Sequence, residues 1–122
     1  DRVALGQLVF SCSDALSQLN QLVHPKIKVS VLETVASIKP MENGVVVGAL
    51  INEIGLTEVC DHILFIDVDR KKILNRMPEK DVIIRHQSEA DIYRLEATSV
   101  IRNDFSGSFF QDGMQVFEKL LR

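Results

Sequence analysis

The chain has 122 residues and a formal net charge of −3, with 46% hydrophobic and 25% charged residues. This composition is typical of a globular domain and excludes a disordered chain, while the acidic balance argues against a nucleic-acid polymer as a partner. At this length we expect one α+β domain over residues 1–122. The sequence begins with Asp1 and not with a methionine, which predicts that the domain is excised from a longer chain.

Residues 3–23 are predicted to form an amphipathic helix, because apolar side chains recur there at helical spacing. Pro25 is expected to end this helix, since the residue before a proline is pushed out of the α region. Beyond it, Ile27, Val29 and Val31 alternate with polar residues, which predicts a half-buried strand.

Four more strands are predicted along the chain, at residues 45–51, 62–68, 82–86 and 92–101. Short polar turns separate most of them, so we expect a mostly antiparallel five-stranded sheet. Gly48 predicts a bend in the second strand, by which the sheet would curl into a small split barrel. Asp112 and Gln115 have the spacing of a capping box, which predicts a C-terminal helix to match the N-terminal one.

Asp67 and Asp69 follow the most apolar of the predicted strands. Two carboxylates in such a position can hold Mg²⁺ against a phosphate. The run from Phe65 to Asn75 also resembles the metal-binding strand of diguanylate cyclases. One hypothesis is therefore a metal-dependent phosphotransfer enzyme that uses Asp67 and Asp69. A solvated turn between two strands explains the same residues, because turns favour Asp and surface charge.

A second hypothesis is a split-barrel sensor domain that binds a nucleotide or a flavin. Arg85 and Arg94 would share one hairpin face and bind a phosphate bidentately. Opposite charges on neighbouring strands give these arginines an ordinary explanation as well. The sequence contains no phosphate-binding loop and no serine-nucleophile motif, and its histidines lack metal-ligand spacing. We therefore expect no cofactor, no metal site and no enzymatic activity.

Aromatic residues and a methionine gather near the C-terminal end of the chain, namely Phe105, Phe109, Phe110, Met114 and Phe117. Such residues are enriched in the cores of protein interfaces. The stripe therefore predicts an interface with an adjoining domain or with a second copy of the chain. The same side chains would equally form core where the closing helix covers the sheet.

The two cysteines, Cys12 and Cys60, lack metal-ligand spacing. Two thiols in a chain that can build a hydrophobic core indicate a reducing compartment. No apolar run in the sequence is long enough to span a bilayer. We therefore expect a cytoplasmic protein without a membrane span.

The strand region, residues 26–102, resembles the N-terminal domain of bacterial flagellar brake proteins. The resemblance rests on four pieces: Ile63–Asp67, Leu74–Arg76, Val82–Arg85 and Tyr93–Val100. In that family the domain precedes a PilZ domain that binds cyclic di-GMP. The resemblance implies a non-enzymatic regulatory or protein-interaction module of a larger bacterial signalling protein. A nucleotide second messenger would then act on the full-length protein, and this is the leading hypothesis.

Overall fold

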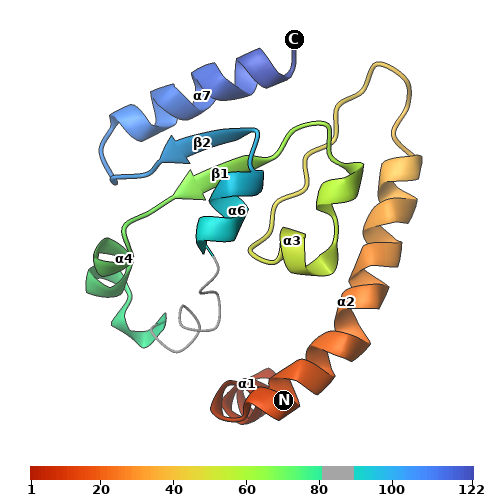
Figure 1. The fold of residues 1–122 in the computed structure, drawn as a ribbon, viewed down its shortest axis with the longest axis vertical. Helices are drawn as coiled ribbons and strands as arrows, with labels where there is room; N and C mark the ends of the chain where they lie inside the picture. Colours follow the sequence, from red (N-terminus) through yellow and green to blue (C-terminus); the bar gives the residue numbers. More distant parts are fainter. Residues whose placement is uncertain (81–89) are drawn as a thin grey trace. The chain divides into compact units, whose positions relative to one another are not determined.

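The computed structural model describes residues 1–80 and 90–122 (Figure 1). These residues divide into two compact units, Asp1–Val59 and Cys60–Arg122. The strand predicted at residues 82–86, together with Arg85, lies outside the described residues.

The regular elements of the first unit are all helical. They are α1 (Arg2–Ser11), α2 (Ser13–Ala36), the single turn α3 (Ile51–Ile54) and the 3₁₀ turn η1 (Thr57–Val59). Cys12 separates α1 from α2 because its backbone is extended, with φ −138° and ψ 110°. Helix α2 contacts both α1 and α3. The Lys28 Nζ atom also lies 3.3 Å from Glu58 Oε2, which ties α2 to η1.

Helix α2 continues through the segment for which the sequence predicts a helix end and then a strand, and both predictions are wrong. Pro25 lies inside the helix. From that point the less exposed side chains have helical and not alternating spacing: His24, Lys28, Val31, Leu32 and Val35. A proline inside a helix costs one backbone hydrogen bond. The contacts of the half-buried face offset this loss, since tertiary packing supplies most of a helix's stability.

The strand predicted at residues 45–51 does not form among the described residues. The backbone of residues 42–48 has no regular structure, and α3 already begins at Ile51. The side chains of Val45 and Val47 are 61% and 91% exposed. A strand needs a neighbour to complete its backbone hydrogen bonds, and the described part of the chain provides none here.

The second unit contains one small sheet and several helices. Its elements are β1 (Leu64–Asp67), α4 (Arg70–Arg76), the 3₁₀ turn η2 (Pro78–Lys80), α6 (Ala90–Glu96), β2 (Ser99–Arg102) and α7 (Ser108–Leu120). The strands β1 and β2 are parallel, and no other sheet occurs in residues 1–80 and 90–122. The predicted α+β fold with a five-stranded antiparallel sheet is therefore wrong. The described residues are predominantly helical, and helices α4 and α6 lie between the parallel strands β1 and β2 in the sequence.

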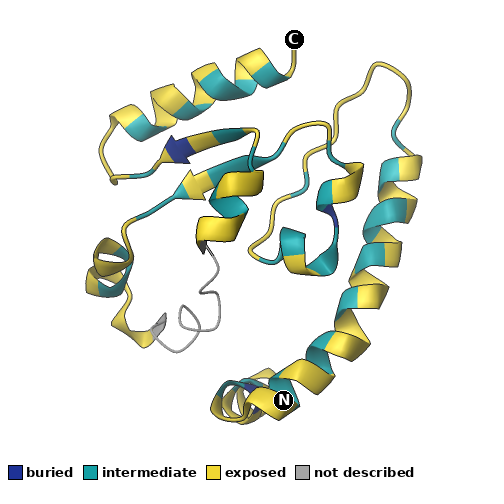
Figure 2. Cartoon of the chain, in the orientation of Figure 1, coloured by how far each residue is buried: buried dark blue, intermediate teal, exposed yellow. Residues whose placement is uncertain are grey.

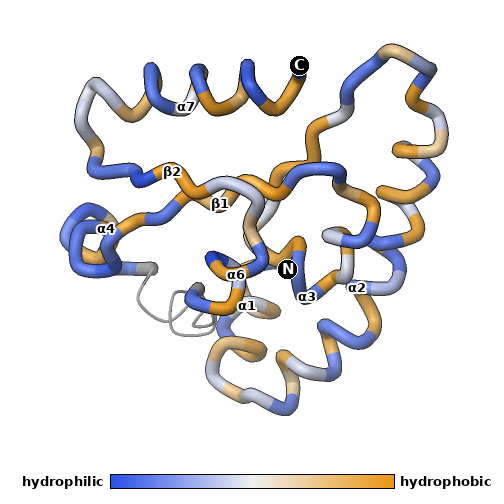
Figure 3. Tube along the Cα trace, turned by 45° about the horizontal axis from the view of Figure 1, so that its top comes forward, coloured by the Kyte–Doolittle hydropathy of each residue, from blue (hydrophilic) through white to orange (hydrophobic). Residues whose placement is uncertain are grey.

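Half of the strand predicted at residues 92–101 is helix α6, and only its last three residues enter β2. The helix is favoured by an ion pair one turn apart, in which Arg94 Nη1 lies 2.7 Å from Asp91 Oδ1. The change of structure occurs at Thr98, whose hydroxyl oxygen accepts a hydrogen bond from Ile63 N at 3.0 Å. The predicted strand at residues 62–68 is present as β1, which is mainly hydrophobic, while α4 after it is mainly hydrophilic (Figure 3).

The C-terminal helix α7 starts at Ser108, four residues before the predicted cap at Asp112. It contacts β2 and is amphipathic. One face is half-buried, as Figure 2 shows, and consists of Phe109, Gly113, Val116, Phe117 and Leu120. Ile101 of β2 is only 6% exposed, and its Cδ1 atom would lie 3.9 Å from a Cβ atom built on Gly113. The core of this unit therefore lies between α7 and β2.

Candidate functional site

The two parallel strands of the second unit end at the same edge of their sheet. β1 ends at Asp67, and β2 ends at Arg102, which is its partner in the register. In open α/β sheets, ligands bind outside the carboxyl ends of the strands. This edge is therefore the candidate functional site. We call its polar residues the strand-end cluster: Asp67, Lys72, Arg76, Arg94, Arg102, Asn103, Asp104 and Ser106.

Arg94 joins α6 to the end of β1. Its Nη2 atom lies 2.7 Å from Asp67 Oδ1, and its Nη1 atom lies 2.7 Å from Asp91 Oδ1. The guanidinium carbon is also 5.7 Å from the centre of the Phe65 ring. The hydrogen bond that Arg94 donates to Asp67, together with the negative charge of Asp67, raises the pKa of Arg94 above its ordinary value. The guanidinium is therefore a permanent cation, held in place from two sides.

One donor of this guanidinium has no partner. Arg94 Nε is buried and makes no hydrogen bond, although Nη2 next to it is bonded. A buried donor without an acceptor costs free energy and calls for an explanation. Nε and Nη2 share one edge of the planar guanidinium, which matches the two oxygens of a carboxylate. Asp67 occupies only one of these two positions.

The loop after β2 is held by its own side chains. Asn103 Oδ1 accepts a hydrogen bond from Phe105 N at 2.9 Å, and Asp104 Oδ1 accepts one from Ser106 N at 2.8 Å. Hydrogen bonds from the hydroxyl and the backbone N–H of Ser106 lower the pKa of Asp104. Phe105 has a positive φ of 64°, a conformation that costs a non-glycine residue about 1–2 kcal/mol. The surrounding bonds hold this strained backbone in place.

Helix α4 braces the same loop. Asp69 caps the helix, because its Oδ1 atom accepts a hydrogen bond from Lys71 N at 2.8 Å. One turn later Lys72 Nζ lies 3.5 Å from the Asp104 carbonyl oxygen. The guanidinium carbon of Arg76 lies 4.1 Å from the centre of the Phe105 ring, a cation–π contact. Two basic residues of α4 thus reach the residues that follow β2.

The metal-binding hypothesis for Asp67 and Asp69 is wrong. Asp69 serves as a helix cap and Asp67 is paired with Arg94, so the two carboxylates do not converge on one point. Within the described ranges, no group of three or more His, Cys, Asp or Glu side chains could hold a metal ion. The sensor hypothesis is not supported either, because Arg94 lies on a helix and Arg85 lies outside the described residues.

The five residues predicted to form an interface are placed in three different environments. Phe105 lies beneath Arg76, and Phe109 and Phe117 belong to the half-buried face of α7. Phe110 and Met114 are 73% and 44% exposed. A common interface for these five residues stays a prediction.

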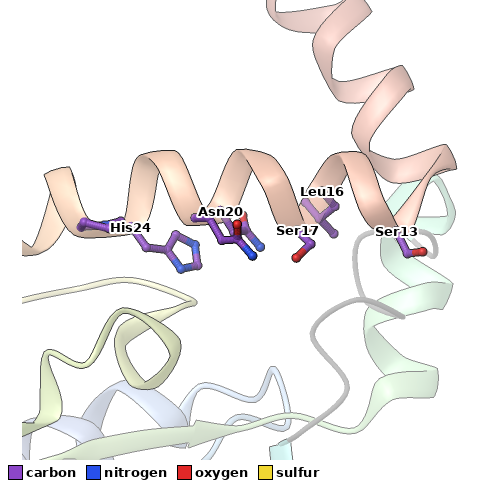
Figure 4. Close-up of a pocket in the computed structure, with 7 residues that line it drawn as sticks. Ser13, Leu16, Ser17, Asn20 and His24 are labelled. Carbon is purple, nitrogen blue, oxygen red and sulfur yellow. The ribbon is translucent and has the colours of Figure 1, made fainter.

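The first unit carries a separate hollow on one face of α2 (Figure 4). Its volume is about 570 Å³. The residues that line it are Ser13, Leu16, Ser17, Asn20, Gln21, His24 and Pro25. All seven belong to α2, so the hollow lies on one face of a single helix and is not an enclosed site.

A comparison with protein families identifies the family of this chain and tests the functions predicted from its sequence. A family model described as dephospho-CoA kinase matches residues 1–106. The chain belongs to the dephospho-CoA kinase family. The match covers both units up to the loop that follows β2, and so includes the strand-end cluster.

Curated dephospho-CoA kinases from bacteria show the same relationship. The relative from Vibrio vulnificus (strain CMCP6) is 33% identical over 90 residues, which are 74% of this chain and 44% of the relative. The relative from Parasynechococcus marenigrum is 30% identical over 89 residues, 73% of this chain and 45% of the relative. The relative from Aggregatibacter actinomycetemcomitans is 31% identical over 112 residues, 85% of this chain and 54% of the relative. The chain spans about half the length of these relatives.

Membership of the dephospho-CoA kinase family overturns the leading hypothesis from the sequence. The resemblance to flagellar brake proteins is wrong, and so is the expectation of a non-enzymatic signalling module, because the family is one of enzymes. Two of the expected partners are contradicted as well, namely a cyclic di-GMP messenger and an adjoining domain. The sensor alternative and the metal-dependent enzyme that uses Asp67 and Asp69 do not match the family either. Among the described residues, each helix is too short or too polar to cross a membrane.

Sequence reasoning singled out two residues of the strand-end cluster, Asp67 and Arg94, but it paired Asp67 with Asp69, which instead caps α4. It missed Asp104 and the contact between Arg76 and Phe105. The available signal was the Asn103-Asp104 pair directly after an apolar strand, because both residue types hydrogen-bond their own backbone and tolerate the left-handed region. It predicts a structured turn at that point.

Proposed function

We propose that this chain is part of an enzyme that transfers a phosphoryl group from ATP to dephospho-CoA. The γ-phosphoryl group leaves ATP and joins a hydroxyl oxygen of dephospho-CoA, whose proton is released, and the products are ADP and CoA. The family match over residues 1–106 carries the proposal. The names of the bacterial relatives support it.

The strand-end cluster supports the proposal because it gathers cations at the edge where parallel sheets bind ligands. Lys72, Arg76 and Arg102 are exposed, whereas Arg94 is engaged with two carboxylates. Phosphoryl transfer depends on cations that neutralise charge on the phosphate groups. In the proposed enzyme, Lys72, Arg76 and Arg102 bind substrate phosphates and Arg94 holds the end of β1.

A kinase of this type also needs a loop whose backbone N–H groups surround the phosphates of ATP. The sequence of residues 1–122 contains no glycine-rich phosphate loop that ends in Gly-Lys-Ser or Gly-Lys-Thr. We propose that this loop comes from sequence beyond these residues, and that the chain alone binds substrate without transferring phosphate. We also propose a cytoplasmic location, because Cys12 and Cys60 do not form a disulfide with each other.

Binding is tested by calorimetry of the 122-residue chain with MgATP and with dephospho-CoA. MgATP and dephospho-CoA both carry phosphate groups. We expect the replacement Lys72→Met to weaken binding of the ligand whose phosphate contacts Lys72 by about tenfold, which is the effect of one lost charge-assisted hydrogen bond. Lys119→Met is the matched control, because Lys119 is an exposed lysine of α7 outside the cluster. Equal effects of the two replacements would exclude the cluster as the phosphate site.

Transfer is tested in a chimaera in which this chain replaces the matching 90 residues of the Vibrio vulnificus relative. We expect the chimaera to convert dephospho-CoA to CoA with consumption of ATP. A folded chimaera that binds neither substrate and forms no CoA overturns the proposed function.

A further inference from the structure

One nitrogen of Arg94 has no hydrogen-bond acceptor in the described part of the chain. Arg94 Nε is buried and unpaired, although Nη2 beside it lies 2.7 Å from Asp67 Oδ1. A buried donor that stays unpaired costs free energy, so we expect an acceptor within its reach. Because solvent does not reach Nε, a dissolved ion binds it only if the guanidinium moves. The acceptor therefore comes from the protein itself.

The guanidinium of Arg94 is held more firmly than the carboxylate that it binds. Asp91 Oδ1 lies 2.7 Å from Nη1, and the guanidinium carbon lies 5.7 Å from the centre of the Phe65 ring. Asp67 bonds Arg94 through one oxygen, and its side chain is 29% exposed. The torsion that turns an aspartate carboxylate is broad, so the group rotates at low cost. Asp67 is thus the mobile partner of the pair.

The shapes of the two groups indicate where the Asp67 carboxylate can turn. Nε and Nη2 lie on one edge of the planar guanidinium, and this edge matches the two oxygens of a carboxylate. A turn that keeps Oδ1 of Asp67 on Nη2 brings Oδ2 to Nε. The pair then has two parallel hydrogen bonds, and Nε has its acceptor. Bidentate pairs of this kind are among the strong hydrogen-bonded pairs in proteins.

The cations of the strand-end cluster act on the second oxygen of Asp67. Asp67 and Arg102 are partners in the strand register, and the side chains of Arg102, Lys72 and Arg76 are exposed. These positive charges favour an oxygen that faces the cluster. A phosphate group bound among them neutralises their attraction and adds negative charge, which repels that oxygen. Phosphate therefore favours the arrangement with two bonds to Arg94.

We infer that the Asp67 carboxylate has two positions, and that a phosphate group bound at the strand-end cluster turns its second oxygen onto Arg94 Nε. The inference rests on the proposed function for the kind of ligand, a phosphate of a nucleotide or of dephospho-CoA. Asp67 is then a positioning residue, which withdraws its charge from the edge where the ligand binds. Because coupling between two equilibria is reciprocal, an Asp67 carboxylate held on Nε also strengthens phosphate binding.

The side-chain N–H signal of Arg94 Nε in nuclear magnetic resonance spectra reports the position of Asp67. The 122-residue chain is titrated with inorganic phosphate and with MgATP, and the signal is assigned through its coupling to the Arg94 backbone. We expect it to move downfield and its exchange with water to slow by about tenfold, the effect of one charge-assisted hydrogen bond. The same signal of Arg2, an exposed arginine of α1, is the control and should not change. Phosphate binding without a change at Arg94 overturns the inference.

Charge variants test the reason for the movement. Arg94→Lys keeps the cation but lacks an edge with two donors, so Asp67 stays turned towards the cluster and phosphate binding should weaken about threefold. Adding Asp67→Asn removes the repelling charge and should restore the affinity. Adding Asp91→Asn instead is the matched control and should restore little, because Asp91 is 92% exposed and screened by water. A structural role of Arg94 alone predicts no restoration by Asp67→Asn, and that result overturns the inference.

The inference and the proposed function can fail separately. A chimaera with the Vibrio vulnificus relative that forms CoA while its Arg94 signal stays unchanged rejects the movement of Asp67 and keeps the kinase. An Arg94 signal that responds to phosphate in a chimaera that forms no CoA supports the movement and rejects the kinase. If the 122-residue chain binds neither probe, the chimaera is titrated in the same way, and absence of binding there also overturns the inference.

Discussion

Arg94 Nη2 lies 2.7 Å from Asp67 Oδ1, and this contact joins helix α6 to the last residue of β1. The side chain of Asp67 is 29% exposed and that of Asp91, the second partner, is 92% exposed. The same guanidinium therefore makes one partly screened and one almost fully solvated ion pair. Fully solvated pairs contribute little to stability.

We expect Asp67→Asn to lower the melting temperature of the chain more than Asp91→Asn. The reason is that the Asp67 pair is less screened and joins two elements, whereas the Asp91 pair lies within one helix. Arg94→Lys should fall between Arg94→Met and the unmodified chain, because lysine keeps the charge but cannot reach two carboxylates in a fixed plane. Thermal unfolding followed by circular dichroism measures the order. A larger effect of Asp91→Asn would contradict it.

The lowered pKa of Asp104 predicts a pH dependence of stability. A carboxyl group whose pKa is lower in the folded chain than its ordinary value of 3.8 stabilises the fold above that value. This contribution is lost as the pH falls from 3.8 through the lower pKa of the folded chain. Asp104→Asn should therefore flatten the stability profile below about pH 4. Urea unfolding between pH 6 and pH 2.5 measures the difference, with Asp112→Asn as the control outside the loop.

The positive φ of Phe105 predicts an unusual order of two replacements. Phe105→Gly and Phe105→Ala both remove the ring beneath Arg76, but only alanine keeps the strain of the left-handed backbone. We expect the glycine variant to be more stable than the alanine variant by about 1 kcal/mol in urea unfolding. In an unstrained loop alanine is the more stable of the two, so the opposite order would show that the loop is relaxed.

Gly55 ends α3 with a φ of 74°, and a Cβ atom there would lie 3.0 Å from Lys28 Nζ. We expect Gly55→Ala to destabilise the chain by about 1 kcal/mol and to weaken the contact of Lys28 with Glu58. Gly107→Ala is the control, because Gly107 has a φ of −65° and no neighbour within 4 Å. It should be neutral or stabilising by about 0.5 kcal/mol in the same urea experiment.

The elements predicted correctly from the sequence are those that depend only on the residues within them. β1 was predictable because Ile63–Ile66 is an apolar run bounded by polar residues, and the amphipathic helix at the C-terminal end was predictable from its spacing. The direction of the strands was not predictable in this way. It depends on whether helices connect them, and residues 92–96 satisfy helical and alternating patterns equally well.

The predicted strand after Pro25 failed for a related reason. Ile27, Val29 and Val31 favour a strand by type, but Val31, Leu32 and Val35 also form one face of a helix. Only tertiary contacts decide between these readings. The strand-end cluster could not be predicted from local patterns either. Its acidic and basic residues come from segments about 30 residues apart in the sequence, such as Lys72 and Asp104.

Pro25 also divides α2 into two segments that can unfold independently of each other. Proline has no N–H, so the carbonyl of Gln21 receives no helical hydrogen bond from residue 25. The series of backbone hydrogen bonds that would couple unfolding at the Ser13 end of α2 to unfolding at the Ala36 end is interrupted at this carbonyl. Fraying that starts at one end of α2 can therefore stop there, and the half of the helix beside α3 stays folded while the other half opens.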